Sequence, residues 1–285
     1  MKSYLRFLGR NKLYTAIEVV GLSISLAFVI IIGCHAWNMY TMTWNIPDHE
    51  DIYALNGPSK GMASMELYNH VDKIPEVREH VIYNYNDIYV EYGDGMFADK
   101  IILAGEGFFE MFPCKSKAGN IGRLQDDGTV VITKSMAERL FGGPEESIGK
   151  PIILNKFGSK EDPSYYSTLQ VSAVIDDFDN SIFMSAGIVI NYEAGARCVI
   201  PTFSPQIFVK TDGYVSRMEL SEKIRQIIDE YCTEEPHWNP EYSYADPLDD
   251  LIIHESHFGL MHSGSTVMII LAVIAIVLLL SAVFN

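Results

Sequence analysis

The stretch Thr129–Gly143, TVVITKSMAERLFGG, contains the sharpest change of secondary-structure signal in the chain. Its first five residues are all β-branched, which predicts a buried strand over 129–133. The next eight residues, 134–141, predict a short helix, because Gly142-Gly143-Pro144 forms a strong stop behind them. A strand that leads directly into a helix is typical of a domain that mixes both kinds of element.

The same alternation continues on both sides of this stretch. Further strands are expected at 51–55, 81–92, 96–103, 151–154, 169–175, 187–192 and 206–210, with a hairpin turn at 93–95. Further helices are expected at 62–73, 106–112, 216–231 and 247–253, and 216–231 has the clearest apolar face. The sequence therefore predicts an α+β domain over 43–265 in which strands dominate the centre.

Two apolar runs flank this domain. Val19–Trp37 has 19 residues and no formal charge, and Val267–Phe284 has 18 residues that are apolar except for Ser281. A helix of the first length spans about 28 Å, which is close to the thickness of the bilayer core. We therefore expect a transmembrane helix within 13–42 and a second, incomplete one within 266–285. Neither run shows the polar face that a core helix of a soluble domain would have.

The charge is distributed very unevenly. The 285 residues contain 21 Lys and Arg against 37 Asp and Glu, a net charge of −16, of which 43–265 carries −19. Residues 1–12 carry +4, from Lys2, Arg6, Arg10 and Lys12. The positive-inside rule then places the N-terminal segment in the cytoplasm and the acidic domain outside. A domain this acidic is not a general nucleic-acid binder, and four scattered Cys cannot form a dense disulfide scaffold.

The first apolar run also allows other interpretations. A basic segment before an apolar stretch is typical of a signal peptide, and Ile31-Ile32-Gly33-Cys34 resembles a lipoprotein cleavage site at which Cys34 would be acylated. The membrane-anchor and lipoprotein interpretations differ in the mass of the mature protein. If the run stays in the membrane, Gly21 and Ser25 form a small-xxx-small pattern that lets another helix approach closely.

The motifs of common catalytic sites are absent. The sequence has no Walker A loop, and Gly142–Pro151 is only a near miss with the wrong spacing. Asp176, Asp177 and Asp179 could form an acid/base pair or a Ca²⁺ site, but a turn after a strand is the more frequent use of such a run. His254, His257 and His262 stand just before the second apolar run, where a solvated loop is expected. We therefore predict no catalytic residue, no bound cofactor and no metal site.

Two ordered motifs indicate a family. Thr133-Lys134-Ser135-x-Ala137-x-x-Leu140-Phe141-Gly142, followed by Ile148-Gly149-Lys150, resembles a segment of the outer domain of MacB/FtsX-type ABC transporter permeases. Val171-x-Ala173-Val174-Ile175-Asp176-Asp177-Phe178, followed by Asn180-Ser181, resembles that domain's next motif. Two positions depart from the family pattern: Asp179 stands where Pro is common and Ala173 where Gly is common. The motif residues with an expected structural role are Thr133, Ser135, Ala137, Leu140, Phe141, Gly142, Gly149, Asp177, Phe178 and Ser181.

The resemblance also implies an architecture and partners. The family has four membrane helices and a large outer domain between the first two, with a porter-like α+β part, here about 46–112 and 205–262, and a β-rich insert, about 113–204. The permease dimerises in the bacterial inner membrane and works with a cytoplasmic ATPase subunit. The ATPase subunit, and not the permease, binds ATP. The outer domain is periplasmic and meets an adaptor or lipoprotein partner. Efflux, lipoprotein release and cell-envelope signalling are the roles implied.

A second hypothesis fits the same topology. A two-helix membrane sensor also has an outer ligand-binding domain between two membrane helices. It predicts a coiled coil or a kinase after residue 285, whereas the permease predicts two further apolar runs. A third hypothesis, a surface enzyme that uses the 176–179 carboxylates, requires an activity that depends on Asp176 and Asp177.

Overall fold

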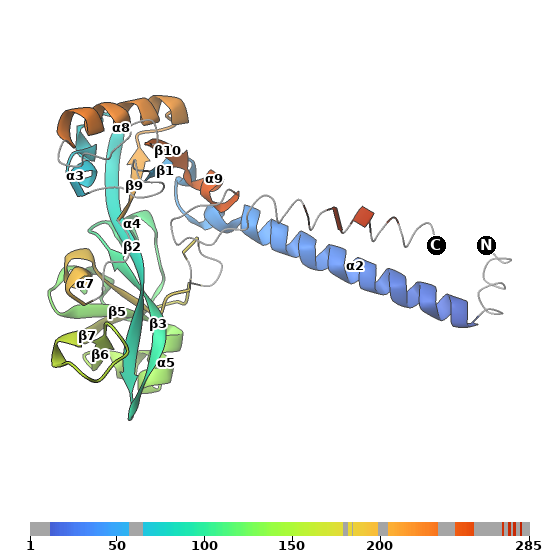
Figure 1. Cartoon of the computed structure of the whole chain (residues 1–285), viewed down its shortest axis with the longest axis horizontal. Coiled ribbons are helices and arrows are strands. Elements are labelled where there is room, and N and C mark those ends of the chain that lie inside the picture. Colours follow the sequence, from blue (N-terminus) through green and yellow to red (C-terminus); the bar gives the residue numbers. More distant parts are fainter. Residues whose placement is uncertain are drawn as a thin grey trace.

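The computed structural model describes residues 12–56, 65–178, 182–183, 185–198, 205–232 and 243–253, with Ile270, Val273, Ile274, Ile276, Val277 and Leu280. Helix α2 (Lys12–Tyr40) extends away from the folded domain as a single rod (Figure 1). Its segment Thr15–Asn38 has 24 residues, and the most apolar 18-residue window within it has a mean hydropathy of 2.4 and is almost entirely unburied. By length and composition this helix can cross a membrane.

One lobe of the domain, which we call the α8 lobe, is a four-stranded antiparallel sheet. Its order is β10 (Tyr244–Pro247), β1 (Ile52–Asn56), β9 (Gln206–Thr211) and the first half of β2 (Val77–Tyr92). One face packs against α8 (Arg217–Tyr231), α3 (Met65–Tyr68) and the 3₁₀ turn Val71–Lys73. Side chains alternate between the faces with the period of two that a strand imposes: Tyr53 and Leu55 face the helices, and Ile52 and Ala54 face away.

The other lobe, which we call the barrel lobe, is a closed ring of six strands. The second half of β2 pairs with β3 (Gly95–Ala104), which pairs with β8 (Ile188–Asn191) and then β5 (Thr129–Thr133). Strand β5 pairs with β7 (Tyr166–Ile175), and β6 (Pro151–Asn155) joins β7 back to β2. All six strands contribute buried residues to one apolar cluster, which includes Ile88, Ile101, Ile188, Ile132, Val171 and Ile152. Strand β2 therefore runs through both lobes (Figure 1).

Shorter elements complete the domain. They are α4 (Phe108–Met111), β4 (Ser116–Gly119), α5 (Lys134–Phe141), α6 (Pro144–Ser147), α7 (Tyr192–Cys198) and α9 (Leu248–Ile253), with 3₁₀ turns at Met42–Asn45, His49–Asp51, Ile121–Gln125 and Pro163–Tyr165. Strand β4 pairs antiparallel with β7 outside the ring. This arrangement confirms the mixed α+β fold and the strand and helix predicted at 129–133 and 134–141.

Several predicted elements have different bounds in the structure, among them the strands expected at 81–92 and 169–175, which begin at Val77 and Tyr166. The helix expected at 62–73 is divided into α3 and a 3₁₀ turn, and 62–64 lie outside the described residues. The strand expected at 187–192 ends at Asn191, because the Asn191 side chain accepts hydrogen bonds from the Glu193 and Ala194 N–H groups and starts α7. The helix expected at 247–253 begins one residue later, since Pro247 is the last residue of β10.

The predicted second membrane helix stays a prediction. Within 266–285 the six described positions, between Ile270 and Leu280, are helical, and the other residues lie outside the part of the chain that the structure describes. Of the basic residues that orient the N-terminus, Lys12 is the first residue of α2, while Lys2, Arg6 and Arg10 lie outside the described residues.

Candidate functional site at the membrane-proximal junction

The end of α2 is anchored in the core of the domain. The Thr41 N–H and hydroxyl both donate to the Trp37 carbonyl, at 3.0 and 2.9 Å, which closes the last turn of the helix. The next residue, Met42, is only 3% exposed and belongs to the apolar cluster between the lobes. Trp44 instead stays exposed, with its ring edge-on to Trp37 and Tyr40 at 5.9 and 5.7 Å. The chain thus passes directly from an exposed apolar helix into a packed core.

An aromatic group forms the core that receives Met42. The Phe112 ring lies 4.9 Å from Phe183 and 5.1 Å from Phe208, and Tyr83 lies 5.2 Å from Phe183. These rings come from β2, β9 and the loops that follow α4 and β7. Close-packed side chains cannot move independently, so a displacement of the end of α2 is passed on to both lobes.

Helix α9, which leads toward the second apolar run, packs on the same core. Leu248 and Leu251 are at most 2% exposed and belong to the same cluster as Met42. The His49 Nδ1 atom lies 3.1 Å from Asp249 Oδ1 and 3.2 Å from Oδ2, which ties the segment after α2 to α9. Helix α9 also contacts α2 and lies beside its domain end (Figure 1). The two flanks of the domain therefore meet on one side of it.

A second polar contact fixes the segment after α2. Asp48 adopts a left-handed backbone conformation with φ of 53°, and its Oδ2 atom lies 2.8 Å from the Lys210 ammonium of β9. The hydrogen bond from Lys210, followed by its charge, lowers the pKa of the Asp48 carboxyl. This contact holds the segment against the sheet of the α8 lobe.

A cavity of about 540 Å³ lies at this junction. Its lining includes Met42, Ile46, Phe112, Cys114, Asp177 and Phe183. Burial raises the pKa of the Cys114 thiol to about 11, so this thiol is neutral near pH 7.

The predicted motif residues cluster around α5 and the barrel. Thr133 caps α5 by accepting a hydrogen bond from the Met136 N–H at 3.4 Å. Gly142 ends the helix with a φ of 91°, a left-handed conformation that favours glycine. Gly149, with a φ of 76°, donates its N–H to the Val171 carbonyl at 2.8 Å. Ala137 is fully buried, and Leu140 and Phe141 pack against the barrel cluster.

The two motifs meet at Asp177. This carboxylate accepts hydrogen bonds from the N–H and the hydroxyl of Ser135, and the next residue, Phe178, is buried beside Met42 in the inter-lobe cluster. Ser181 lies outside the described residues. Gly21 and Ser25 lie apart from this site on α2, where the Ser25 hydroxyl donates to the Gly21 carbonyl at 2.9 Å.

The residues proposed for catalysis have structural partners. Asp176 forms an ion pair of 2.7 Å with Lys117, and Asp177 holds Ser135. Asp179, His254, His257 and His262 lie outside the described residues. Within the part of the chain that the structure describes, no group of three His, Cys, Asp or Glu side chains is placed to hold a metal ion.

Sequence reasoning did not identify the contacts that define the junction. His49 and Asp249 are 200 residues apart, and neither stands in a motif. Met42 follows an apolar run, so its burial cannot be told from simple continuation of the membrane helix. A possible signal was the position of 247–253 as a short helix directly before the second apolar run.

Known proteins share the fold of this domain. Residues 15–227 match the family model of the MacB-like periplasmic core domain, which covers well over half of the chain. No curated protein matches the sequence. A domain of a putative permease protein from Porphyromonas gingivalis is similar in structure, with a TM-score of 0.53, 20% identity, and coverage of 71% of this chain and 92% of that one.

Two further solved structures have the same fold. The periplasmic region of MacB from Actinobacillus actinomycetemcomitans gives a TM-score of 0.53 at 16% identity, covering 73% of this chain and 93% of that one. The extracellular domain of the noncanonic ABC-type transporter YknZ from Gram-positive bacteria gives a TM-score of 0.51 at 15% identity, covering 68% of this chain and 99% of that one. At these identities the likeness concerns the fold alone. The family match is what identifies the chain: it belongs to the MacB-like periplasmic core domain family of ABC transporter permeases.

Proposed function

We propose that this chain is part of a permease subunit that transmits movement from a cytoplasmic ATPase to a periplasmic domain. The observation that carries the proposal is the junction, where Met42 and the α9 residues Leu248 and Leu251 share one buried core. A domain that only binds a ligand can be attached by a flexible linker. Burial of the residue two positions beyond the end of the membrane helix instead makes the attachment stiff.

The chemistry of ATP belongs to another subunit in this proposal. The 285 residues contain no Walker A loop, and the proposal assigns ATP binding to a cytoplasmic ATPase subunit. A second permease copy completes the transporter, as is usual for closed symmetric assemblies. The N-terminus is cytoplasmic, the protein is a multi-pass protein of the bacterial inner membrane surrounded by lipid, and the domain is periplasmic.

The outer domain then acts on a periplasmic adaptor or lipoprotein partner. Efflux, lipoprotein release and cell-envelope signalling are the roles that such a movement can serve. We assign the porter-like part to about 46–112 and 205–262 and the β-rich insert to about 113–204. Strands β2 and β3 of the first part pair with β6 and β8 of the insert, which supports a mechanical connection between these parts.

Affinity purification of the full-length protein from its native membrane tests this function. We expect an ATP-binding-cassette ATPase in stoichiometric amount, and ATP hydrolysis by the purified complex. An unrelated tagged membrane protein from the same membrane is the control for nonspecific capture. Recovery of a histidine kinase in place of the ATPase supports the two-helix sensor, and recovery of neither contradicts the transporter assignment.

A further inference from the structure

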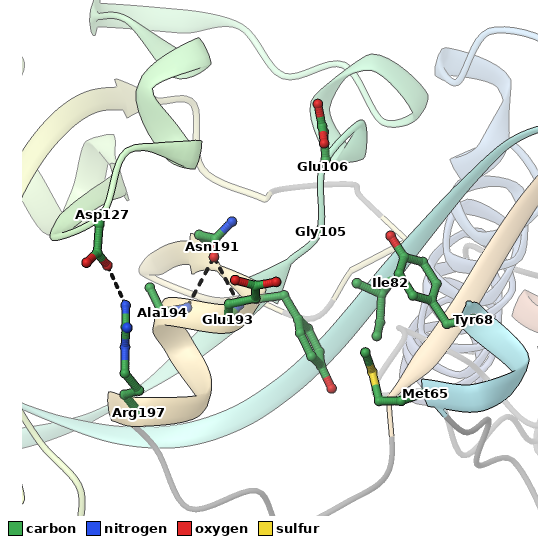
Figure 2. Close-up of a pocket in the computed structure, with 11 residues that line it drawn as sticks. Met65, Tyr68, Ile82, Gly105, Glu106, Asp127, Asn191, Glu193, Ala194 and Arg197 are labelled. Atoms are coloured by element: carbon green, nitrogen blue, oxygen red, sulfur yellow. Dashed lines mark hydrogen bonds and ion pairs between the residues drawn. The ribbon is translucent and has the colours of Figure 1, made fainter.

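A cleft of about 450 Å³ separates the two lobes. Figure 2 shows its sides: Met65 and Tyr68 on α3 of the α8 lobe face Glu193 and Arg197 on α7 of the barrel lobe. A volume of this size is typical of sites for small organic ligands. The cleft shares none of its lining residues with the junction cavity.

The floor of the cleft is backbone. The Gly105 N–H donates to the Ile82 carbonyl at 2.8 Å, so the chain after β3 lies directly on β2. A Cβ atom at residue 105 would meet the Ile82 side chain at 2.5 Å and the Ile82 carbonyl oxygen at 3.1 Å. Glycine therefore allows residue 105 to pack closely on Ile82, and the next residue, Glu106, stands at the edge of the cleft (Figure 2).

The α7 side of the cleft carries a fixed negative charge. The Asn191 side chain accepts hydrogen bonds from the Glu193 and Ala194 N–H groups at 3.0 and 3.1 Å, which holds the first turn of α7 in place. The Arg197 guanidinium is paired with Asp127, so its charge is already compensated. Among the residues that the structure describes, neither Glu193 nor Glu106 has an ion-pair partner.

The α3 side of the cleft is aromatic. Tyr68 is half-buried, and its ring packs edge-on against His80 at 5.1 Å, which fixes the orientation of the ring. Burial raises the pKa of Tyr68, and the Glu106 charge raises it further. Exposed Met65 extends this apolar surface.

We propose that the inter-lobe cleft binds an amphiphilic organic cation. Its ammonium or guanidinium group pairs with the carboxylates of the cleft lining, Glu106 and Glu193, and its apolar part lies against Tyr68 and Met65. Carboxylates attract the charge, and the face of a tyrosine ring binds cations as well as apolar groups. An anion of the same size would be repelled by the two carboxylates, Glu106 and Glu193, whose charges no ion pair compensates among the described residues.

The inference deepens the proposed function and rests on it, because it names the class of compound that such a transporter would detect or move. The ligand contacts come from α3 in one lobe and from α7 in the other. A bound cation therefore links the two lobes, and its affinity depends on their separation. Coupling between the cleft and the junction then follows from the aromatic core that both lobes share.

Two isosteric ligands provide the test. Phenethylguanidinium and phenethylurea have nearly the same size and shape and differ in charge. The full chain is purified in a neutral detergent, and binding of each compound is measured by ligand-observed NMR. For about 12 non-hydrogen atoms we expect a Kd on the order of 1 mM for the cation, and binding of the urea about tenfold weaker.

The variants identify the groups responsible. The double variant Glu106→Gln with Glu193→Gln is expected to weaken the cation about tenfold and leave the urea unchanged. Glu145→Gln with Glu222→Gln removes the same charge from exposed positions outside the cleft and is expected to change neither. Equal binding of both compounds to the native chain, an unaffected double variant, or no binding of the cation overturns the proposal. Loss of the ATPase partner in the purification experiment would instead contradict the proposed function, so the two failures are distinguishable.

Discussion

Asp177 holds Ser135 across 42 residues of sequence: its Oδ1 atom accepts from the Ser135 N–H at 3.0 Å, and its Oδ2 atom from the Ser135 hydroxyl at 2.8 Å. The contact joins the first turn of α5 to the segment that follows β7. Because the next residue, Phe178, is buried in the same cluster as Met42, this segment links the barrel lobe with the membrane-proximal junction.

Asp177→Ala should lower the free energy of unfolding by about 1 kcal/mol, because two exposed hydrogen bonds to a helix N-terminus are lost. Ser135→Ala should lower the free energy of unfolding by less, since the backbone N–H of residue 135 still donates to Asp177. Urea unfolding of the full chain measures both. Asp176→Ala is the matched control and should stay within about 0.5 kcal/mol, because it removes only an exposed ion pair. An equal loss in the control would contradict the role given to Asp177.

Gly119→Ala should be strongly destabilising. Gly119 has a φ of 73°, and a Cβ atom there would lie 2.3 Å from the Ser172 carbonyl oxygen and 2.9 Å from the Ala173 Cα atom. Backbone strain and overpacking together predict a loss of roughly 2–5 kcal/mol. Gly93→Ala is the control, since residue 93 also has a positive φ but meets nothing within 4 Å. Gly93→Ala should lower the free energy of unfolding by only about 1 kcal/mol. Similar melting temperatures for the two variants would contradict the close packing of β4 on β7 at Gly119.

Met42→Ala should lower the stability of the outer domain by about 2–4 kcal/mol, because a fully packed side chain leaves a cavity in the shared core. Trp44→Ala, two residues further on, removes a larger but exposed side chain and should cost less than about 1 kcal/mol. Thermal unfolding in detergent compares them. The reverse order of stability would show that the segment after α2 is not anchored through Met42.

The Glu76–Lys223 pair should make stability depend on pH. The hydrogen bond from Lys223 lowers the pKa of Glu76, and the bond to Glu76, followed by that to Glu219, raises the pKa of Lys223. The Glu76 carboxylate therefore contributes to the free energy of unfolding above its unfolded-state pKa of about 4.3. This contribution is lost as pH falls through the lower pKa that Glu76 has in the folded state. The Lys223 ammonium contributes fully to the free energy of unfolding below its unfolded-state pKa of about 10.4. This contribution is lost as pH rises through the higher pKa that Lys223 has in the folded state.

Glu76→Gln should accordingly unfold at lower urea concentration than the native chain near pH 7. The two midpoints should converge in acid below about pH 4. Glu222→Gln on the same helix is the control, because Glu222 makes only a long contact of 3.5 Å with Arg225 at the surface. A constant difference between Glu76→Gln and the native chain from pH 7 to pH 3 would contradict the assigned pair.

Local sequence signals predicted the elements that have local causes. The strand at 129–133, the helix at 134–141 and the helix end at Gly142 follow from β-branching and a glycine stop, and the structure has them at the predicted bounds. Strand β4, SKAG, has no β-propensity of its own and forms because β7 offers a free edge. The strand predicted at 187–192 extends one residue too far, because only the fold shows that the Asn191 side chain caps helix α7.

The site was less predictable than the fold, because its contacts are long-range. The motifs around Ser135 and Asp177 indicated a family, but no spacing rule shows that the two residues touch. His49 and Asp249 lie near the two ends of the domain and meet only because β1 and β10 are neighbours in the sheet. The closure of β6 onto β2 likewise depends on the shape of the whole barrel.

The most direct test of the central claim is the distance between the two permease copies in different nucleotide states. A spin label at residue 222, on exposed helix α8, is introduced into full-length protein whose native cysteines are replaced, and the protein is reconstituted with its ATPase. Pulsed electron paramagnetic resonance then gives the label-to-label distance distribution. We predict a distribution that shifts between the nucleotide-free and the ATP-bound complex, because the junction transmits helix movement to the domain. The same distribution in both states, or no label-to-label signal at all, would contradict the account.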